Sequence, residues 1–191
     1  MRCVIVVLAA LLVPSVASAQ AATGVFGEYV YAHPDFEDVH VSTGDTLNGW
    51  LGGVDVPVGN RFGLTARADG SYGDAFHQGV VSQPSGDQFR SALYTVTAGP
   101  RVSLISNPRS TVFVDGLFGV VHGRASTMGV DFTGVVDDAA FIGGGGGGLD
   151  IRLSRLIDVR VDAQYRWTNL FDQTLNLVHV GAGVVFRPTR R

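Results

Sequence analysis

The segment IDVRVDAQYRW, residues 157–167, alternates between apolar and polar side chains without a break. Successive side chains of a β-strand point to opposite faces, so this period of two predicts a strand with one apolar face and one polar face. The pattern is too regular for a helix, whose apolar residues recur every three or four positions. We therefore read the rest of the chain for further strands of the same kind.

Seven further segments show the same period of two, which gives eight candidate strands and an all-β chain. The clear ones are Phe62–Tyr72, Ala92–Leu104 and Ala139–Leu153. The weaker ones are Val25–Tyr31, Trp50–Val56, Val112–Val121 and Val178–Phe186.

The connections between these segments alternate in length. Short ones fall at residues 58–61, 105–110 and 154–156, and long ones at 32–46, 73–90, 123–138 and 168–175. Short turns at one end and long loops at the other are typical of a transmembrane up-and-down barrel with both termini at the short-turn end. Each strand needs about 9–11 residues to cross a bilayer, and closure leaves no unpaired backbone in lipid. We predict a single eight-stranded antiparallel barrel.

The start of the chain predicts export. Met1 and Arg2 precede an apolar run from Val4 to Val13, and Ala17-Ser18-Ala19 provides a cleavage site for a signal peptide. Ten apolar residues are too few for a membrane-spanning helix, which needs about 20. We expect residues 1–19 to be the signal peptide, 20–186 the barrel and 187–191 a short arginine-rich tail.

The composition excludes several function classes. All fourteen basic residues are Arg, so no lysine nucleophile exists, and with a net charge of −3 and no basic tract we expect no nucleic-acid partner. The only cysteine, Cys3, lies in the predicted signal peptide, which excludes disulfides and cysteine-bound zinc in the mature chain. We expect no cofactor.

The two faces of the predicted strands carry different residue sets. Six aromatic residues lie on the apolar parity near the long-loop ends, as expected of a membrane-interface girdle; they are Tyr31, Trp50, Tyr72, Tyr94, Tyr165 and Trp167. Phe62 and Phe186 mark the opposite rim. The polar parity carries charges of both signs that we expect to pair across the lumen, namely Glu28, Asp55, Arg67, Asp69, Arg101, Asp115, Asp150, Arg152, Asp158, Arg160, Asp162 and Arg166. A polar plug is favoured over a conducting pathway.

Several short motifs resemble the small eight-stranded outer-membrane β-barrel domain of OmpA-like and opacity-porin-like proteins. They are Asn48-Gly49-Trp50, the run Leu93–Leu104 containing Gly99-Pro100-Arg101, Phe113 with Leu117-Phe118-Gly119, Gly147-Gly148-Leu149-Asp150 with the following strand through Tyr165, and the closing Gly181–Phe186. The resemblance implies the bacterial outer membrane, lipid contact and the barrel-assembly machinery as a partner. Two departures are the residues that follow Phe186, where the family usually ends on an aromatic, and the missing peptidoglycan-binding domain, so no cell-wall anchoring is expected.

Chemical sites are weakly indicated. Gly143–Gly148 is followed by no Lys-Ser or Lys-Thr and opens no helix, which argues against a phosphate loop. Some barrels of this kind are acyl hydrolases or transferases, and His122 with Ser126 is the nearest approach to a triad, but no geometry is fixed. Acidic residues in the loops form a hypothetical divalent-cation site; they are Asp35, Glu37, Asp38, Asp45, Asp131, Asp137 and Asp138.

We therefore predict a non-enzymatic, monomeric outer-membrane barrel with a structural or surface-interaction role, whose loops hold any surface ligand. Two alternatives remain open. One is a soluble secreted barrel of lipocalin type that binds a small apolar ligand inside, which requires the apolar parity to face inward. The other is a small low-conductance pore, which requires unpaired charges along the lumen.

Overall fold

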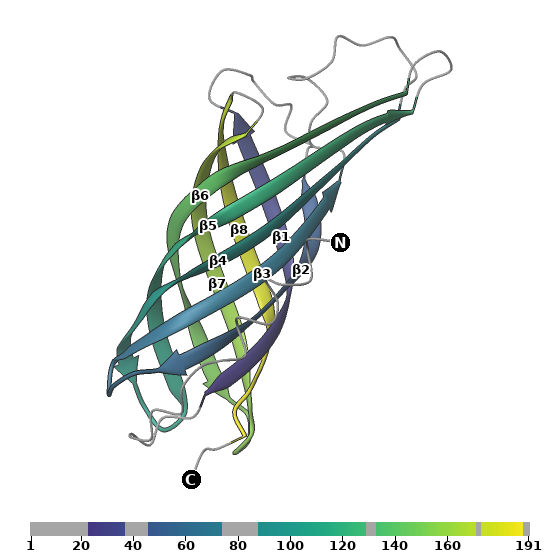
Figure 1. Cartoon of the computed structure of the whole chain (residues 1–191). Coiled ribbons are helices and arrows are strands. Elements are labelled where there is room, and N and C mark those ends of the chain that lie inside the picture. The colour runs from purple at the N-terminus through teal and green to yellow at the C-terminus, as the bar shows by residue number, and fades with distance from the viewer. Residues whose placement is uncertain (1–22, 37–45, 74–87, 129–132, 171–172, 189–191) are drawn as a thin grey trace, which may run out of the picture.

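The computed structural model describes residues 23–36, 46–73, 88–128, 133–170 and 173–188, which form a closed barrel of eight antiparallel strands in chain order (Figure 1). The all-β prediction and the predicted topology are confirmed. Within the described residues, no helix is long and apolar enough to cross a membrane. The strands are β1 (Gly24–Phe36), β2 (Leu47–Pro57), β3 (Phe62–Gly73), β4 (Gln88–Ser106), β5 (Ser110–Met128), β6 (Thr133–Arg152), β7 (Ile157–Leu170) and β8 (Gln173–Phe186).

The barrel closes between its first and last strands. β1 and β8 pair from Val25 opposite Phe186 to Phe36 opposite Leu175, so the two strands meet at the short-turn end. The short turns are held by backbone hydrogen bonds, for example those donated by the Val58 and Gly59 N–H groups to the Phe62 carbonyl oxygen at 2.9 and 3.0 Å. No strand edge is left open around the ring, which is the condition for a sheet to exist in lipid.

The apolar parity faces outward. Along β7 the burial alternates residue by residue, with charged Arg160 and Arg166 buried inside and Val161, Tyr165 and Trp167 exposed outside. This is the reverse of a water-soluble barrel, whose apolar side chains fill the interior. The lipocalin-type alternative is therefore wrong, since it requires the apolar parity to line the lumen.

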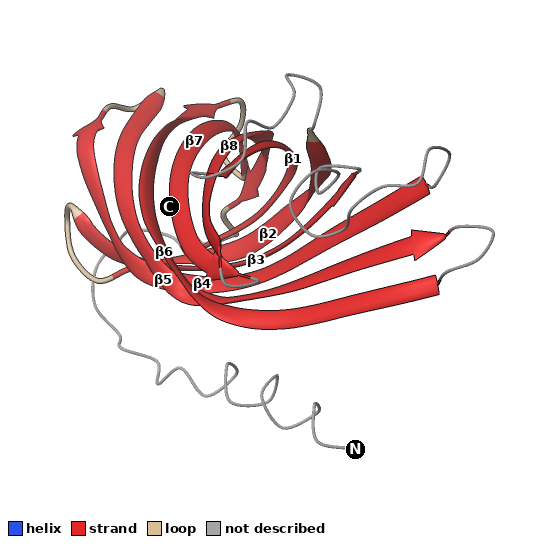
Figure 2. Cartoon of the chain, turned by 90° about the horizontal axis from the view of Figure 1, so that it is seen from above, coloured by secondary structure: helices blue, strands red, loops and turns tan. Residues whose placement is uncertain are grey.

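Three strands are much longer than predicted. β4 and β5 have 19 residues each and β6 has 20, and they project beyond the ring (Figures 1 and 2). The predicted loop 123–138 is mostly a hairpin, in which β5 and β6 pair as far as Met128 opposite Thr133. The predicted loop 168–175 likewise shortens, because β7 and β8 pair as far as Leu170 opposite Gln173. Backbone pairing continues here through polar and glycine residues that read as loop in the sequence.

The interior has three layers. An open pocket of about 250 Å³ lies at the short-turn mouth and reaches Asp55, Arg101 and Asp150. A buried layer of charged side chains follows. The long-loop end is closed by an apolar cluster from seven strands, namely Ala32, Leu47, Leu93, Val121, Ile142, Leu170, Leu175 and Leu177. The prediction of a polar interior is therefore incomplete, because the outer end of the lumen is capped by aliphatic side chains.

Candidate functional site

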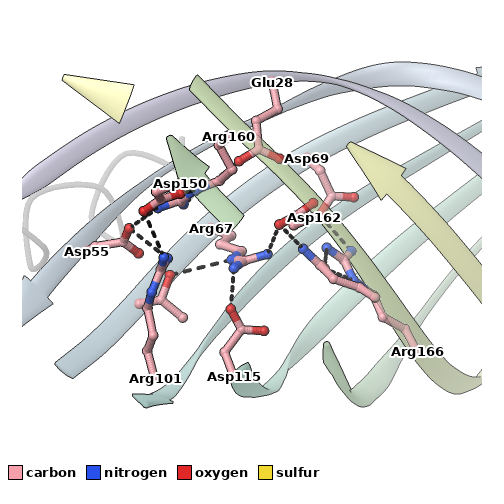
Figure 3. Close-up of polar contacts among 12 residues, drawn as sticks. Glu28, Asp55, Arg67, Asp69, Arg101, Asp115, Asp150, Arg160, Asp162 and Arg166 are labelled. Atoms are coloured by element: carbon pink, nitrogen blue, oxygen red, sulfur yellow. Dashed lines mark hydrogen bonds and ion pairs between the residues drawn. The ribbon is translucent and has the colours of Figure 1, made fainter. Parts of the chain in front are cut away.

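The structure brings the predicted lumen charges together in one buried network (Figure 3). Eleven of the twelve predicted residues are buried inside the barrel: Glu28, Asp55, Arg67, Asp69, Arg101, Asp115, Asp150, Asp158, Arg160, Asp162 and Arg166. They come from β1 to β7 and face one another because every second residue of each strand points inward. Buried charges are tolerated only when they are paired and hydrogen-bonded, so the individual contacts decide what the network does.

Arg160 and Arg101 hold the part of the network nearest the mouth. The Arg160 guanidinium donates to Asp150 Oδ1 at 2.7 Å through Nε and to Asp55 Oδ2 at 2.7 Å through Nη2. The Arg101 guanidinium donates to the same two carboxylates, at 2.8 Å to Asp55 Oδ2 and 3.2 Å to Asp150 Oδ2. Two arginines on β4 and β7 thus share two aspartates on β2 and β6, which ties four strands together across the lumen.

Arg67 and Arg166 hold the part nearer the apolar cap. Arg67 on β3 bridges Asp115 and Asp162, the second at 3.0 Å. Arg166 on β7 donates to Asp69 Oδ1 on β3 at 2.7 Å. Asp162 also lies on β7 and Asp115 on β5, so these pairs join β3 to two strands that are not its neighbours in the sheet.

Two buried phenylalanines pack against the arginines. The Arg160 guanidinium carbon lies 4.4 Å from the ring centre of Phe26 and 4.9 Å from that of Phe113. Arg101 lies 3.3 Å from the Phe113 ring centre. Cation–π contacts of desolvated guanidinium groups contribute about 2 kcal/mol each. Neither ring could be placed in the lumen from the sequence, because both are apolar residues on the inward parity of weakly alternating strands.

At the mouth of the barrel, the membership of the charge network differs from the prediction at two residues. Arg152, predicted to be a member, is exposed, because it is the last residue of β6 and lies beyond the enclosed part of the lumen. Arg187, which the sequence placed in the tail, reaches inside and donates to Asp150 Oδ2 at 2.6 Å and Asp158 Oδ2 at 2.8 Å. Its backbone N–H also donates to the Leu156 carbonyl oxygen at 2.9 Å. The inward parity of Val185, two residues earlier, is the signal that could have identified it.

All six predicted interface aromatics lie on the outer surface, each between 42% and 53% exposed. Three of them form a continuous row across β2, β3 and β4, in which Trp50 Nε1 donates to the Tyr72 hydroxyl oxygen at 3.4 Å and Tyr72 contacts Tyr94 edge-on at 5.8 Å. Trp167 contacts Phe141 with the ring centres 6.0 Å apart. Phe62 and Phe186 are exposed at the short-turn end. The sequence reading did not place exposed Tyr29 and Phe141 in this set.

The remaining candidate residues are scattered. His122 Nε2 lies 3.1 Å from Asp137 Oδ1 in an exposed pair on the β5–β6 hairpin, and the Ser126 side chain lies outside the described residues. Asp137 and Asp138 are strand residues of β6, not loop residues as predicted, because the hairpin pairs through them. Glu37, Asp38, Asp45 and Asp131 lie outside the described residues, as does the Asp35 side chain. Among the described side chains, no three acidic, histidine or cysteine groups converge on one point.

A closed antiparallel ring with an apolar outer face, exposed aromatics and an ion-paired interior defines an outer-membrane β-barrel. Residues 3–187 match the family model described as the outer membrane protein beta-barrel domain. The chain therefore belongs to this family, and its strands cross the bacterial outer membrane. The family resemblance and the localisation drawn from the sequence are confirmed.

Solved structures share this fold at low sequence identity. Ail, the attachment invasion locus protein of Yersinia pestis, is 18% identical with a TM-score of 0.63, over 88% of this chain and 100% of that one. Neisserial surface protein A is 13% identical with a TM-score of 0.60, over 89% and 99%. The N-terminal β-barrel domain of Pseudomonas aeruginosa OprF is 13% identical with a TM-score of 0.50, over 85% and 97%. No curated protein sequence gives a significant match.

Proposed function

We propose that this protein is a non-enzymatic, monomeric surface-interaction barrel that presents the projecting parts of β4, β5 and β6 to an extracellular partner. The observation that carries the proposal is the pairing of β6. Residues 133–141 pair only with β5, because the pairing of β6 with β7 begins at Ile142. Nine residues at about 3.3 Å each extend about 30 Å. This length is additional to residues 142–152 of β6, which pair with β7 and are already enough to cross the bilayer.

The closed lumen supports an interaction role over a pore. Aliphatic side chains fill most of the described lumen at the long-loop end, and the layer beneath them is bridged by ion pairs between facing strands. Conduction requires sites that a hydrated ion can enter and leave. The exposed aromatic row of Trp50, Tyr72 and Tyr94 is the girdle that contacts the outer leaflet in this proposal.

The charge of the projecting hairpin argues against one class of partner. Ail has been crystallised with the heparin analogue sucrose octasulfate, a polyanion. The described charged side chains of this hairpin are Arg124, Asp137, Asp138 and the pair partner His122, so acidic groups outnumber the arginine. Like charges repel, which argues that the partner of this chain is not a polyanion.

A shortened hairpin tests the proposal. Arg124 and Asp137 face each other in the β5–β6 register, so residues 125–136 can be replaced by Asn-Gly, the two-residue turn that suits antiparallel strands. Cells that display the wild-type or the shortened barrel are then compared for attachment to surfaces coated with a cationic, a neutral or a sulfated polymer. We expect the wild-type barrel to increase attachment to the cationic or neutral surface and the shortened barrel to lose this gain at equal surface amount.

A bilayer recording separates this proposal from the pore alternative. The purified wild-type barrel should give no steady conductance in a planar bilayer. Equal attachment by both variants together with a steady conductance would refute the interaction role and support the pore.

A further inference from the structure

β8 has a gap in its inward face at two glycines. Gly181 lies opposite Asp162 of β7, and Gly183 lies opposite Glu28 of β1. Neither glycine carries a side chain, so the acidic side chains of the two flanking strands can reach over β8 from both sides. The Gly181–Phe186 motif, which the sequence reading noted only as a resemblance, therefore has a specific structural consequence.

The two carboxyl groups converge on one point above Gly181. A Cβ atom placed on Gly181 would lie 2.6 Å from Glu28 Oε2 and 2.8 Å from Asp162 Oδ1. Both oxygens therefore occupy the space that a side chain would fill. Two carboxylates that both carry a negative charge and share one buried site repel strongly, and one proton held between them removes this repulsion.

Glu28 has one long ion pair but no hydrogen-bond donor among the described groups. Its side chain is fully buried, and neither carboxyl oxygen accepts a hydrogen bond from the described groups at bonding distance. The nearest guanidinium nitrogen, Arg160 Nη1, lies 3.8 Å from Oε1. Asp162 differs, because its Oδ2 accepts hydrogen bonds from Arg67 and Gln164, each at 3.0 Å.

The described lumen contains more carboxyl groups than guanidinium groups. Five guanidinium groups, those of Arg67, Arg101, Arg160, Arg166 and Arg187, face seven carboxyl groups, those of Glu28, Asp55, Asp69, Asp115, Asp150, Asp158 and Asp162. Toward Glu28 the packed strands present Arg160 and Asp162 from β7, Arg67 from β3, uncharged Leu51 from β2 and the two glycines from β8. The arginines therefore cannot neutralise every carboxylate.

We propose that Glu28 and Asp162 share one proton across Gly181, so that the folded barrel contains a proton-binding site at neutral pH. The protonated carboxyl group donates its O–H to the other carboxylate, and the second oxygen of Asp162 keeps its bonds to Arg67 and Gln164. A metal ion fits less well, since no third acidic or histidine group of the described residues completes a ligand set there.

The site is buried behind the part of the network that lines the open mouth. The open pocket at the mouth reaches Asp55 and Asp150, which bind the same Arg160 that approaches Glu28, whereas the apolar cluster seals the other end. The folded state binds a proton that the unfolded chain releases above the ordinary carboxyl pKa of about 4.3. Raising the pH therefore lowers the folded-to-unfolded ratio tenfold per pH unit until the folded site itself releases the proton.

Infrared spectroscopy of the barrel extracted from outer membranes tests the proposal directly. At about pH 7, exposed carboxyl groups are ionised, so a carbonyl stretching band of a protonated carboxyl group reports a buried proton. We expect this band in the wild type and in the exposed control Asp137→Asn, and its loss in Glu28→Gln and in Asp162→Asn. Absence of the band in the wild type overturns the proposal without any variant.

The pH dependence of unfolding provides the second readout. Between about pH 5.5 and 7.5, the folding constant of the wild type relative to Glu28→Gln should fall about tenfold per pH unit, and the histidines cancel in this ratio. A ratio independent of pH, or a band that persists in Glu28→Gln, overturns the shared proton. A band that added sodium chloride removes at constant pH also overturns it, because a cation then occupies the site.

Discussion

Replacing Arg160 by Met should be among the most destabilising single changes in the lumen. The guanidinium donates three hydrogen bonds to Asp55 and Asp150 and lies between the Phe26 and Phe113 rings. Removing one partner of a buried ion pair costs about 3–5 kcal/mol. Both aspartates keep Arg101 as a partner, so we expect the lower end of this range, about 3 kcal/mol, which is more than a hundredfold in the folding equilibrium.

Urea titration of the barrel in phospholipid vesicles measures this change. The only two tryptophans, Trp50 and Trp167, are exposed on the lipid-facing surface, so their fluorescence reports loss of the folded barrel. Arg152→Met is the matched control, since it removes the same charge from an exposed site at the end of β6. If the free energies of unfolding of Arg160→Met and Arg152→Met agree within about 1 kcal/mol, the buried network does not stabilise the barrel.

Three further changes follow from the same contacts. Gly181→Ala should destabilise the barrel by about 1–3 kcal/mol through steric conflict with two buried carboxyl groups, whereas Gly27→Ala, which meets nothing within 4 Å, should be tolerated in the same urea titration. Arg187→Ala should lower the free energy of unfolding by about 1–3 kcal/mol, because two buried aspartates lose a donor. The exposed control Arg155→Ala should lower it by almost nothing. A smaller difference between the two variants would show that the contact at the mouth is weak. Tyr72→Ala should lower stability by about 1 kcal/mol or more in vesicles, and an unchanged midpoint would argue against the aromatic row.

The topology could be read from the sequence because the alternation has a direct physical cause. In β7 every inward residue must avoid lipid and every outward residue must avoid water, so selection acts on each position separately. The same reasoning placed eleven charged residues in the lumen and six aromatic residues outside. It also predicted the short turns, whose Gly, Asn and Pro residues carry their own local signal.

The projecting hairpin could not be predicted in this way. Beyond the membrane neither face of β5 and β6 borders lipid, so a period of two is not required there. The strands are joined by backbone pairing and by the exposed His122–Asp137 pair. Arg187 could not be predicted from the strand pattern for a different reason: it follows the last residue of β8, so the alternation within the strand does not extend to it. The apolar cap was missed because residues such as Leu47 and Leu177 look like ordinary outward positions until the register is known.

The charged lumen fixes the register of this barrel in a way that an apolar lumen could not. A slip of one residue in any strand exchanges its two faces, which would move charges into lipid. A slip of two residues keeps the faces correct but displaces every cross-lumen pair, such as Arg166 with Asp69 or Arg67 with Asp162, by about 7 Å. Aliphatic side chains would accept that displacement at little cost, whereas buried ions that lose their partners do not. The ion pairs between β3 and β7 therefore select one register among those that the alternation alone allows.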